Sequence, residues 1–227
     1  MSKKYQKMLS ETTLQKINRT VEKYDRAVDE IEPREYFLIV CEGEKTEPNY
    51  FEALSKELPS NLVLVLDGAG ANTMTLVNRA EQIDDNRSKN MGARYDHIWI
   101  VFDRDSFSAE DFNNAVFMCH SKNYNAAYSN ESFELWYLLH FEYLNSGISR
   151  KDYVKKLEEI IKKKTGHKKF RYKKNSPDFY YILCEHGDEK QAIRRAKKLE
   201  EMWDQSNPAK ECPSTYVYKL VEKLRKY

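Results

Sequence analysis

The sequence is poor in the residues that build disulfide frameworks and zinc sites. Only four of its 227 residues are cysteine, and they lie far apart in the chain: Cys41, Cys119, Cys184 and Cys212. The short paired spacings of a zinc site are missing, since Cys119-His120 and Cys184-x-His186 are isolated pairs. The sequence therefore predicts reduced, mostly structural thiols and excludes a small secreted scaffold.

Long apolar runs are also missing. No stretch approaches the roughly 20 consecutive apolar residues of a membrane span, and the opening MSKKYQKMLSETTLQK lacks the apolar run of a signal peptide. Hydrophobic residues make up 41% of the chain, and 16 Tyr, 10 Phe and 3 Trp can still form a core. We expect a soluble cytoplasmic protein without membrane contact, built on one core or on one core with a helical appendage.

The net charge of +2 hides an uneven distribution. Residues 1–150 hold 17 basic and 24 acidic side chains, whereas residues 151–227 hold 21 basic and 12 acidic ones. This split indicates either acidic-site chemistry beside a polyanion-binding surface or simply solvated helices that differ in Lys and Glu content. The motifs must decide between the two.

Three short apolar runs predict strands that are buried on both faces, and each is followed by a polar turn and a helical pattern. These strands are expected over 36–41, 62–66 and 97–102, with helices over 48–57, 74–87 and 109–121. A weaker strand over 124–128 leads into an apolar helix over 131–140. The fold class is therefore α/β, with a mainly parallel sheet flanked by helices. After residue 149 the periodicity is helical throughout.

Acidic side chains stand where these predicted strands end. They are Glu42 and Glu44 after the first strand, Asp103 and Asp105 after the third, and Glu131 and Glu134 after the fourth. The carboxyl ends of parallel strands share one edge, so these side chains are expected to cluster. Like charges at close range need protons or a cation, and oxygen ligands select Mg²⁺ or Mn²⁺. Alternatively, each acid simply stabilises the start of a helix.

Other motifs carry less information. Gly68-x-Gly70 before a helix could admit a phosphate, but it lacks the lysine of a P-loop and the third glycine of a dinucleotide site. Asp103-x-Asp105 could belong to an aspartyl phosphotransferase, but Ser106-Phe107 does not continue that pattern. We interpret the first motif mostly as a turn.

The strand ends carry a resemblance to known families. Leu38-Ile-Val-Cys-Glu42-Gly-Glu44 and Ile100-Val-Phe-Asp103-Arg-Asp105 resemble the Glu-Gly and Asp-x-Asp elements of Toprim domains. The fuller resemblance, over roughly residues 36–225, is to RloB-like proteins. It rests on the two elements above and on Cys41-Glu-Gly-Glu-Lys-Thr-Glu-Pro-Asn-Tyr-Phe51, Ser129-Asn130, Phe133-Glu134-Leu-Trp136-Tyr-Leu-Leu-His-Phe141 and Pro213-Ser-Thr-Tyr-Val-Tyr-Lys-Leu220.

The resemblance implies a Toprim-like, Rossmann-like fold and a nuclease of prokaryotic phage-defence systems, similar to OLD-type proteins and often encoded beside an ATPase. In that family the residue matching Glu42 is a metal ligand or a general acid or base, and those matching Asp103 and Asp105 bind Mg²⁺. Glu134 is the expected further ligand, with Glu131 as the alternative. Asp105 is followed by Ser-Phe without the glycine of many Toprim elements, which favours hydrolysis over topoisomerase or primase chemistry.

The domain plan that follows has three parts. A leading helix is expected over 1–34, a Toprim-like catalytic core over 35–148, and a helical basic part packed on that core over 149–227. Residues 162–174 hold eight Lys and Arg and no acid, with Phe170 and Tyr172 interleaved as backbone tracking and base stacking would require. The expected nucleic-acid contacts are Lys45, Arg104, Lys168, Lys169, Arg171, Lys173 and Lys174.

Two functions remain open at this point. The first is a Mg²⁺-dependent or Mn²⁺-dependent nuclease acting on DNA, RNA or tRNA, with a possible ATPase partner. The second is a nucleic-acid-binding or regulatory subunit that has no activity of its own. Neither the kind of nucleic acid nor the oligomeric state follows from the sequence.

Overall fold

The structure is a computed structural model that describes residues 33–70, 73–104 and 107–227. Nearly all of the expected leading helix lies outside these residues. Residues Glu35–Tyr227 form one compact unit. Its first half contains β1 (Glu35–Cys41), α3 (Thr46–Ser55), β2 (Leu62–Gly68), α4 (Thr73–Met91), β3 (His97–Asp103), α5 (Ala109–Ser121), β4 (Asn125–Asn130) and α6 (Glu134–Leu139). Its second half contains α7 (Arg150–Thr165), α8 (Phe179–His186), α9 (Glu189–Glu200), the 3₁₀ turn η1 (Pro208–Lys210), β5 (Ser214–Thr215) and α10 (Val217–Leu224).

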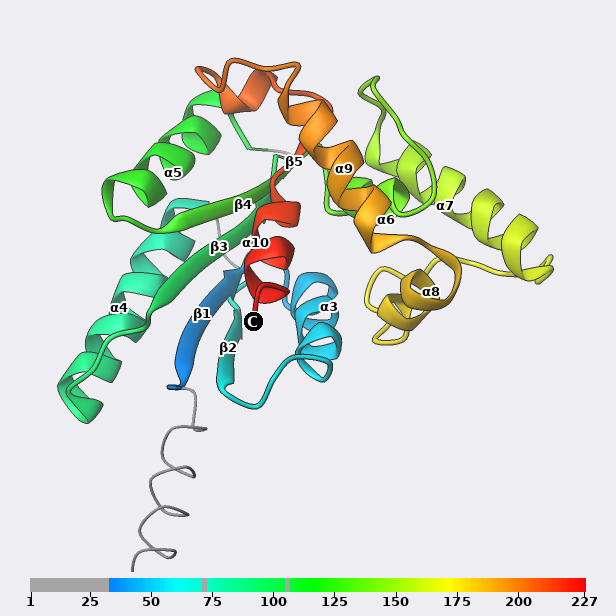
Figure 1. The fold of residues 1–227 in the computed structure, drawn as a ribbon. Helices are drawn as coiled ribbons and strands as arrows, with labels where there is room; N and C mark the ends of the chain where they lie inside the picture. Colours follow the sequence, from blue (N-terminus) through cyan, green and yellow to red (C-terminus); the bar gives the residue numbers. More distant parts are fainter. Residues whose placement is uncertain (1–32, 71–72, 105–106) are drawn as a thin grey trace, which may run out of the picture. The chain divides into compact units, whose positions relative to one another are not determined.

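The strands form a five-stranded sheet in the order β2-β1-β3-β4-β5, and the first four are parallel (Figure 1). Cys41 at the end of β1 lies opposite Val101, and Asp103 at the end of β3 lies opposite Ser129 of β4. All four parallel strands therefore deliver their last residues to one edge. This arrangement confirms the predicted α/β class with a mainly parallel sheet.

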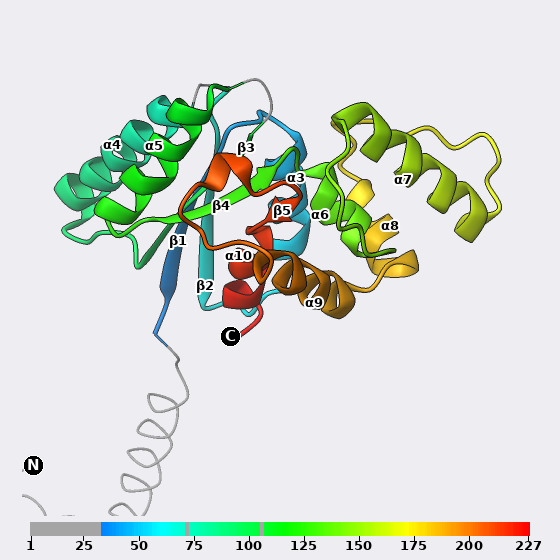
Figure 2. The same cartoon turned by 90° about the horizontal axis from the view of Figure 1, so that it is seen from above.

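Both faces of the sheet are covered by helices, as the continuous apolar strands predict. In β1, Phe37, Ile39 and Cys41 point to one face, and Leu38 and Val40 point to the other. The second face is covered by α4 and α5, and the first by α3 and α10 (Figure 2). Side chains from both faces are fully buried, so each face has its own hydrophobic core.

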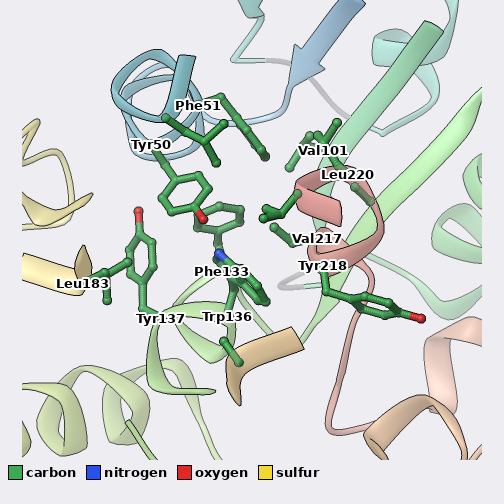
Figure 3. Close-up of a cluster of buried hydrophobic side chains, with 14 of the residues drawn as sticks. Tyr50, Phe51, Val101, Phe133, Trp136, Tyr137, Leu183, Val217, Tyr218 and Leu220 are labelled. Carbon is green, nitrogen blue, oxygen red and sulfur yellow. The ribbon is translucent and has the colours of Figure 1, made fainter. Parts of the chain in front are cut away.

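The larger core joins the sheet to the later helices. Tyr50 and Phe51 of α3 lie beside Phe133, with the rings of Tyr50 and Phe133 edge to face at 5.7 Å (Figure 3). Trp136 from α6 and Val217 from α10 fill the same cluster. Residues after 149 therefore share a core with the strands.

Two differences from the sequence prediction change the elements around β4. The periodicity after residue 149 predicts helices throughout, but Ser214 and Thr215 form β5, which pairs antiparallel with Asn130 and Ser129 of β4. The apolar helix expected from Glu131 begins instead at Glu134. The reason is that β4 continues to Asn130, so residues 131–133 make the turn. None of the helices in the described residues is long and apolar enough to span a membrane.

Candidate functional site

Two parallel strands and two helices bring four carboxylates to the carboxyl edge of the sheet. Glu42 follows β1, and Asp103 is the last residue of β3. The main-chain N–H of Asp103 donates to Glu42 Oε2 at 3.0 Å, which ties the two strand ends together. Glu47 and Glu134 lie in the first turns of α3 and α6, where the helix dipole favours acids.

Glu47 lies under the loop that follows β1. A Cβ atom on Gly43 would stand 2.1 Å from Glu47 Oε2, so only glycine at position 43 leaves room for this carboxyl group. Thr46 fixes the start of the helix, because its hydroxyl donates to the main-chain oxygen of Lys174 at 2.7 Å. The glycine of the Glu42-Gly-Glu44 element therefore leaves space for the Glu47 carboxyl group.

Three of these carboxylates are withdrawn from water. The exposed fractions are 5% for Glu47, 4% for Asp103 and 1% for Glu134. Each keeps a buried oxygen without a hydrogen-bond partner: Glu47 Oε2, Asp103 Oδ1 and Glu134 Oε2. Burial costs such groups free energy when they are charged, and a buried polar atom without a partner needs an explanation.

The pKa values of two of them reflect this crowding. Burial, followed by the charges of Glu47 and Glu134, raises the pKa of Asp103 well above its ordinary value, although Arg150 opposes the rise. Burial, followed by the charges of Glu42 and Glu134, raises the pKa of Glu47 to about 7. The four side chains therefore form one electrostatic unit that favours protons or a cation.

Arg150, the first residue of α7, supplies a positive charge to this unit. Its Nη2 atom donates to Asp103 Oδ2 at 2.6 Å, and its Nε atom lies 3.6 Å from Glu134 Oε2. The guanidinium therefore bridges a strand end and a helix start. It neutralises part of the charge that the carboxylates carry.

Tyr172 connects the basic segment, residues 162–174, to the same site. Its hydroxyl donates to Glu134 Oε1 at 3.2 Å, and its ring packs edge to face against Phe179 at 4.9 Å. Burial and the charge of Glu134 raise the pKa of Tyr172, so the phenol stays protonated. Phe170 also packs partly against the core. The Tyr172 ring is partly buried against the core, and the expectation that these rings stack on bases stays a prediction.

Two of the predicted nucleic-acid contacts meet beside the carboxylates. Lys45 and Lys174 line one pocket of about 300 Å³, together with Gly43, Glu44, Thr46 and Asn175. Both lysines are exposed, and the charge of Lys174 lowers the pKa of Glu47 in opposition to burial. Residues far apart in sequence thus form a basic rim on an acidic site.

The other predicted contacts are more dispersed. Arg104 lies on the opposite face of the sheet from Asp103, where its guanidinium donates to the Phe107 carbonyl and sits 5.9 Å over the Phe112 ring. Arg171 pairs with Glu158 at 3.1 Å. Lys168, Lys169 and Lys173 are exposed along the segment.

Two predicted acids, Glu44 and Glu131, do not join the cluster. Asp105 lies outside the described residues, so its predicted role as a ligand stays a prediction. Burial, and to a smaller extent the charge of Glu131, raises the pKa values of Tyr153 and Cys212, and Glu131 precedes the helix that carries Glu134. Glu44 is exposed, and its carboxyl group lies against Gly70.

The donor chemistry of the cluster fits a hard divalent cation, because all the carboxylate donor atoms are oxygens and three of these oxygens are buried without a hydrogen-bond partner. The spacing of the side chains does not fit such an ion. Among residues 33–70, 73–104 and 107–227, no three histidine, cysteine, aspartate or glutamate side chains are arranged to hold a metal ion. The present arrangement of Asp103 and Glu134 suits the guanidinium of Arg150.

The sequence does not single out Glu47 or Arg150, and it predicts base stacking for Tyr172 rather than a contact with Glu134. Glu47 stands one residue before Pro48, where the sequence predicts the helix to begin, whereas α3 begins at Thr46. Arg150 is one of many basic residues in its region. The available signal for Glu47 is its place inside the Cys41–Phe51 motif, and no local pattern indicates the contact of Tyr172 with Glu134.

The fold and the site together define a class: an α/β protein with buried carboxylates at the carboxyl edge of a parallel sheet, beside a basic pocket. A family model described as RloB-like protein matches residues 37–224. The chain therefore belongs to the RloB-like family, which confirms the resemblance at the level of the family. No curated protein and no solved structure matches the chain.

Proposed function

We propose that this protein is a divalent-metal-dependent nuclease that hydrolyses phosphodiester bonds in nucleic acid. The observation that carries the proposal is the meeting of Glu47, Asp103 and Glu134, each with a buried oxygen that lacks a hydrogen-bond partner, at one edge of a parallel sheet. Such an edge is where open α/β sheets place their chemistry. Membership of the RloB-like family and the resemblance to Toprim elements support it.

The cation is Mg²⁺ or Mn²⁺, and Asp103 and Glu134 are its proposed ligands, with Asp105 as a third ligand from the sequence. When bound, the ion supplies charge neutralisation at a phosphate and an acidified water. Glu42, on the adjoining strand end, orients or deprotonates water or protonates the leaving group. Its Oε2 accepts the main-chain N–H of Asp103, which keeps its carboxyl group beside the proposed ligands.

The basic rim supports nucleic acid as the substrate class. Lys45 and Lys174 line a pocket of about 300 Å³ next to Glu47. A polyanion that contacts these lysines would pass directly beside the carboxylates. The further lysines of the basic segment extend the positive surface away from the site.

The biological setting is proposed from the resemblance alone. Toprim nucleases of the OLD type and RloB-like proteins are associated with phage defence and abortive infection, and an ATPase is often encoded beside them. We propose the same setting here, with an ATPase as a possible partner.

A cleavage assay tests the proposal. Purified protein is incubated with single-stranded and double-stranded DNA, RNA and tRNA, in Mg²⁺, Mn²⁺ or EDTA, with Asp103→Asn as the matched inactive variant. We expect cleavage of at least one substrate that requires the metal and is lost in the variant. Binding without cleavage under every metal condition would instead favour the second function, a nucleic-acid-binding or regulatory subunit.

A further inference from the structure

Arg150 occupies an unfavourable position for a cation. It is the first residue of α7, where the helix dipole repels positive charge, and the Ser149 hydroxyl accepts from the N–H of Asp152 at this end. The guanidinium side chain is nevertheless only 27% exposed. Its contacts with Asp103 and Glu134 must therefore offset both the dipole and the loss of water.

The groups that hold Arg150 are those that the proposed function assigns to a metal ion. Asp103 Oδ2 is 2.6 Å from Arg150, while Asp103 Oδ1 has no partner, and Glu134 Oε2 faces Arg150 Nε at 3.6 Å. Two carboxylates drawn toward a planar guanidinium cannot also close around a small ion that demands short oxygen contacts. Arginine stays protonated at every ordinary pH, so this competition cannot be relieved by deprotonation.

We infer that Arg150 is an exchangeable counter-ion of the site, and that a divalent cation binds only as the guanidinium leaves Asp103 and Glu134. The inference rests on the proposed function and adds a regulating residue to it. Arg150 stabilises the folded protein before the ion arrives and sets a threshold for metal concentration. This accounts for the observation that described carboxylates with fitting chemistry are not spaced for a metal.

The test compares Mn²⁺ binding to the full chain and to Arg150→Met, a neutral residue of similar length. Calorimetric titration at pH 8 after EDTA treatment measures the affinity, and circular dichroism measures the melting temperature with and without Mn²⁺. We expect Arg150→Met to bind Mn²⁺ about tenfold more tightly, because a repelling charge has been removed. Without metal it should melt roughly 5 °C lower, because two buried carboxylates lose their partner.

Lys156→Met is the matched control. Lys156 lies on the same helix and pairs with Glu142 at 3.2 Å, but both side chains are about 40% exposed. The substitution removes the same charge away from the site, so Mn²⁺ affinity should stay within about twofold. Arg150→Lys, which keeps the charge, should stay close to the wild-type affinity.

Wild-type binding combined with equal or weaker binding by Arg150→Met would overturn the inference and leave the proposed function intact. Absence of Mn²⁺ binding in both proteins would overturn the inference and the metal-dependent function together. If Arg150→Met does not fold, the Mn²⁺ affinity of Arg150→Gln is compared with that of the wild type, and the same outcomes apply.

Discussion

At the scale of single residues, Glu47 is the group that the structure adds to the site. Glu47→Gln should lower metal-dependent cleavage by about 100-fold, because it removes one charge from a tightly coupled cluster. It should not lower the melting temperature, since burial and the neighbouring carboxylates disfavour the charged form of Glu47, so its charge does not stabilise the fold.

Glu52→Gln is the control for Glu47. Glu52 lies on the same helix, α3, but its side chain is exposed, so activity should stay within about twofold. Initial cleavage rates at saturating Mg²⁺ measure both variants. Full activity in Glu47→Gln would remove Glu47 from the catalytic machinery.

Glu131 and Glu134 form a second matched pair. Glu134 is 1% exposed and lies beside Asp103 and Arg150, whereas Glu131 acts on Tyr153 and Cys212. Mg²⁺ titrations of cleavage should show a loss of roughly 100-fold for Glu134→Gln and a modest loss for Glu131→Gln. The reverse ranking would place the further ligand before the helix rather than on it. The sequence predicts that Glu42→Gln, Asp103→Asn and Asp105→Asn each abolish metal-dependent cleavage and leave the fold intact.

His140 gives the fold a dependence on pH. It is buried, its Nδ1–H donates to the Trp136 carbonyl at 2.9 Å, and burial lowers its pKa from 6.5 to about 4. The unfolded chain takes up this proton near pH 6.5 and the folded protein only near pH 4. His140 therefore contributes stability fully above pH 6.5, and the contribution is lost as pH falls toward 4, by about 3 kcal/mol.

Urea unfolding at several pH values, with His140→Gln and His167→Gln, checks this prediction. The wild type should lose stability relative to His140→Gln between pH 6.5 and 4, while the exposed His167 should not matter. A pH-independent difference between wild type and His140→Gln would show that the buried imidazole does not titrate as expected.

At the scale of elements, two contacts anchor the last residues of the basic segment to the site. Tyr172 contacts Glu134, and the main-chain oxygen of Lys174 accepts the Thr46 hydroxyl. Lys173 lies between these anchors and Lys174 lines the pocket beside the site, whereas the exposed Lys168 and Lys169 lie farther along the segment. Each phosphate contact contributes roughly 0.7 to 0.9 to the slope of log affinity against log salt. A flatter slope is expected when four lysines are changed to Gln: Lys168, Lys169, Lys173 and Lys174.

Four exposed lysines elsewhere serve as the control for that measurement: Lys89, Lys190, Lys198 and Lys226. Their replacement by Gln changes the net charge equally. Fluorescence anisotropy of a labelled oligonucleotide at several salt concentrations gives both slopes. Equal slopes in the two quadruple variants would move the nucleic-acid surface away from the basic segment.

The strands and their shared edge could be predicted from the sequence, because a buried parallel strand requires a run of apolar residues, and such a run can be recognised in the sequence. Glu42 and Asp103 come directly after these runs, so their positions at the shared edge could be predicted as well. Arg150 and Tyr172 could not be placed, since their contacts join segments 47 and 38 residues apart that only the folded core brings together. The same holds for β5, whose two residues are a strand only because β4 offers Asn130 and Ser129 as partners.

At the scale of the whole molecule, the helical part and the strands share one core and should unfold together. Leu220 of α10 is fully buried in the cluster that also contains Cys41 and Val101. Leu220→Ala should lower the free energy of unfolding by roughly 2–5 kcal/mol in a single transition. Lys223→Ala on the same helix should change it by less than about 0.5 kcal/mol. Separate transitions for residues 35–148 and 149–227 would contradict a shared core.

The late position of β5 and α10 in the chain has a consequence for synthesis. The ribosome delivers the parallel strands first, and α10 covers a face of their sheet only after residue 224 has left the exit tunnel. Until then Cys41, Val101 and their neighbours on that face lack the helix that buries them. The nascent protein must therefore pass through a stage with an uncovered apolar face. During that stage the exposed apolar face favours chaperone binding and aggregation, and this holds regardless of the stability of the native fold.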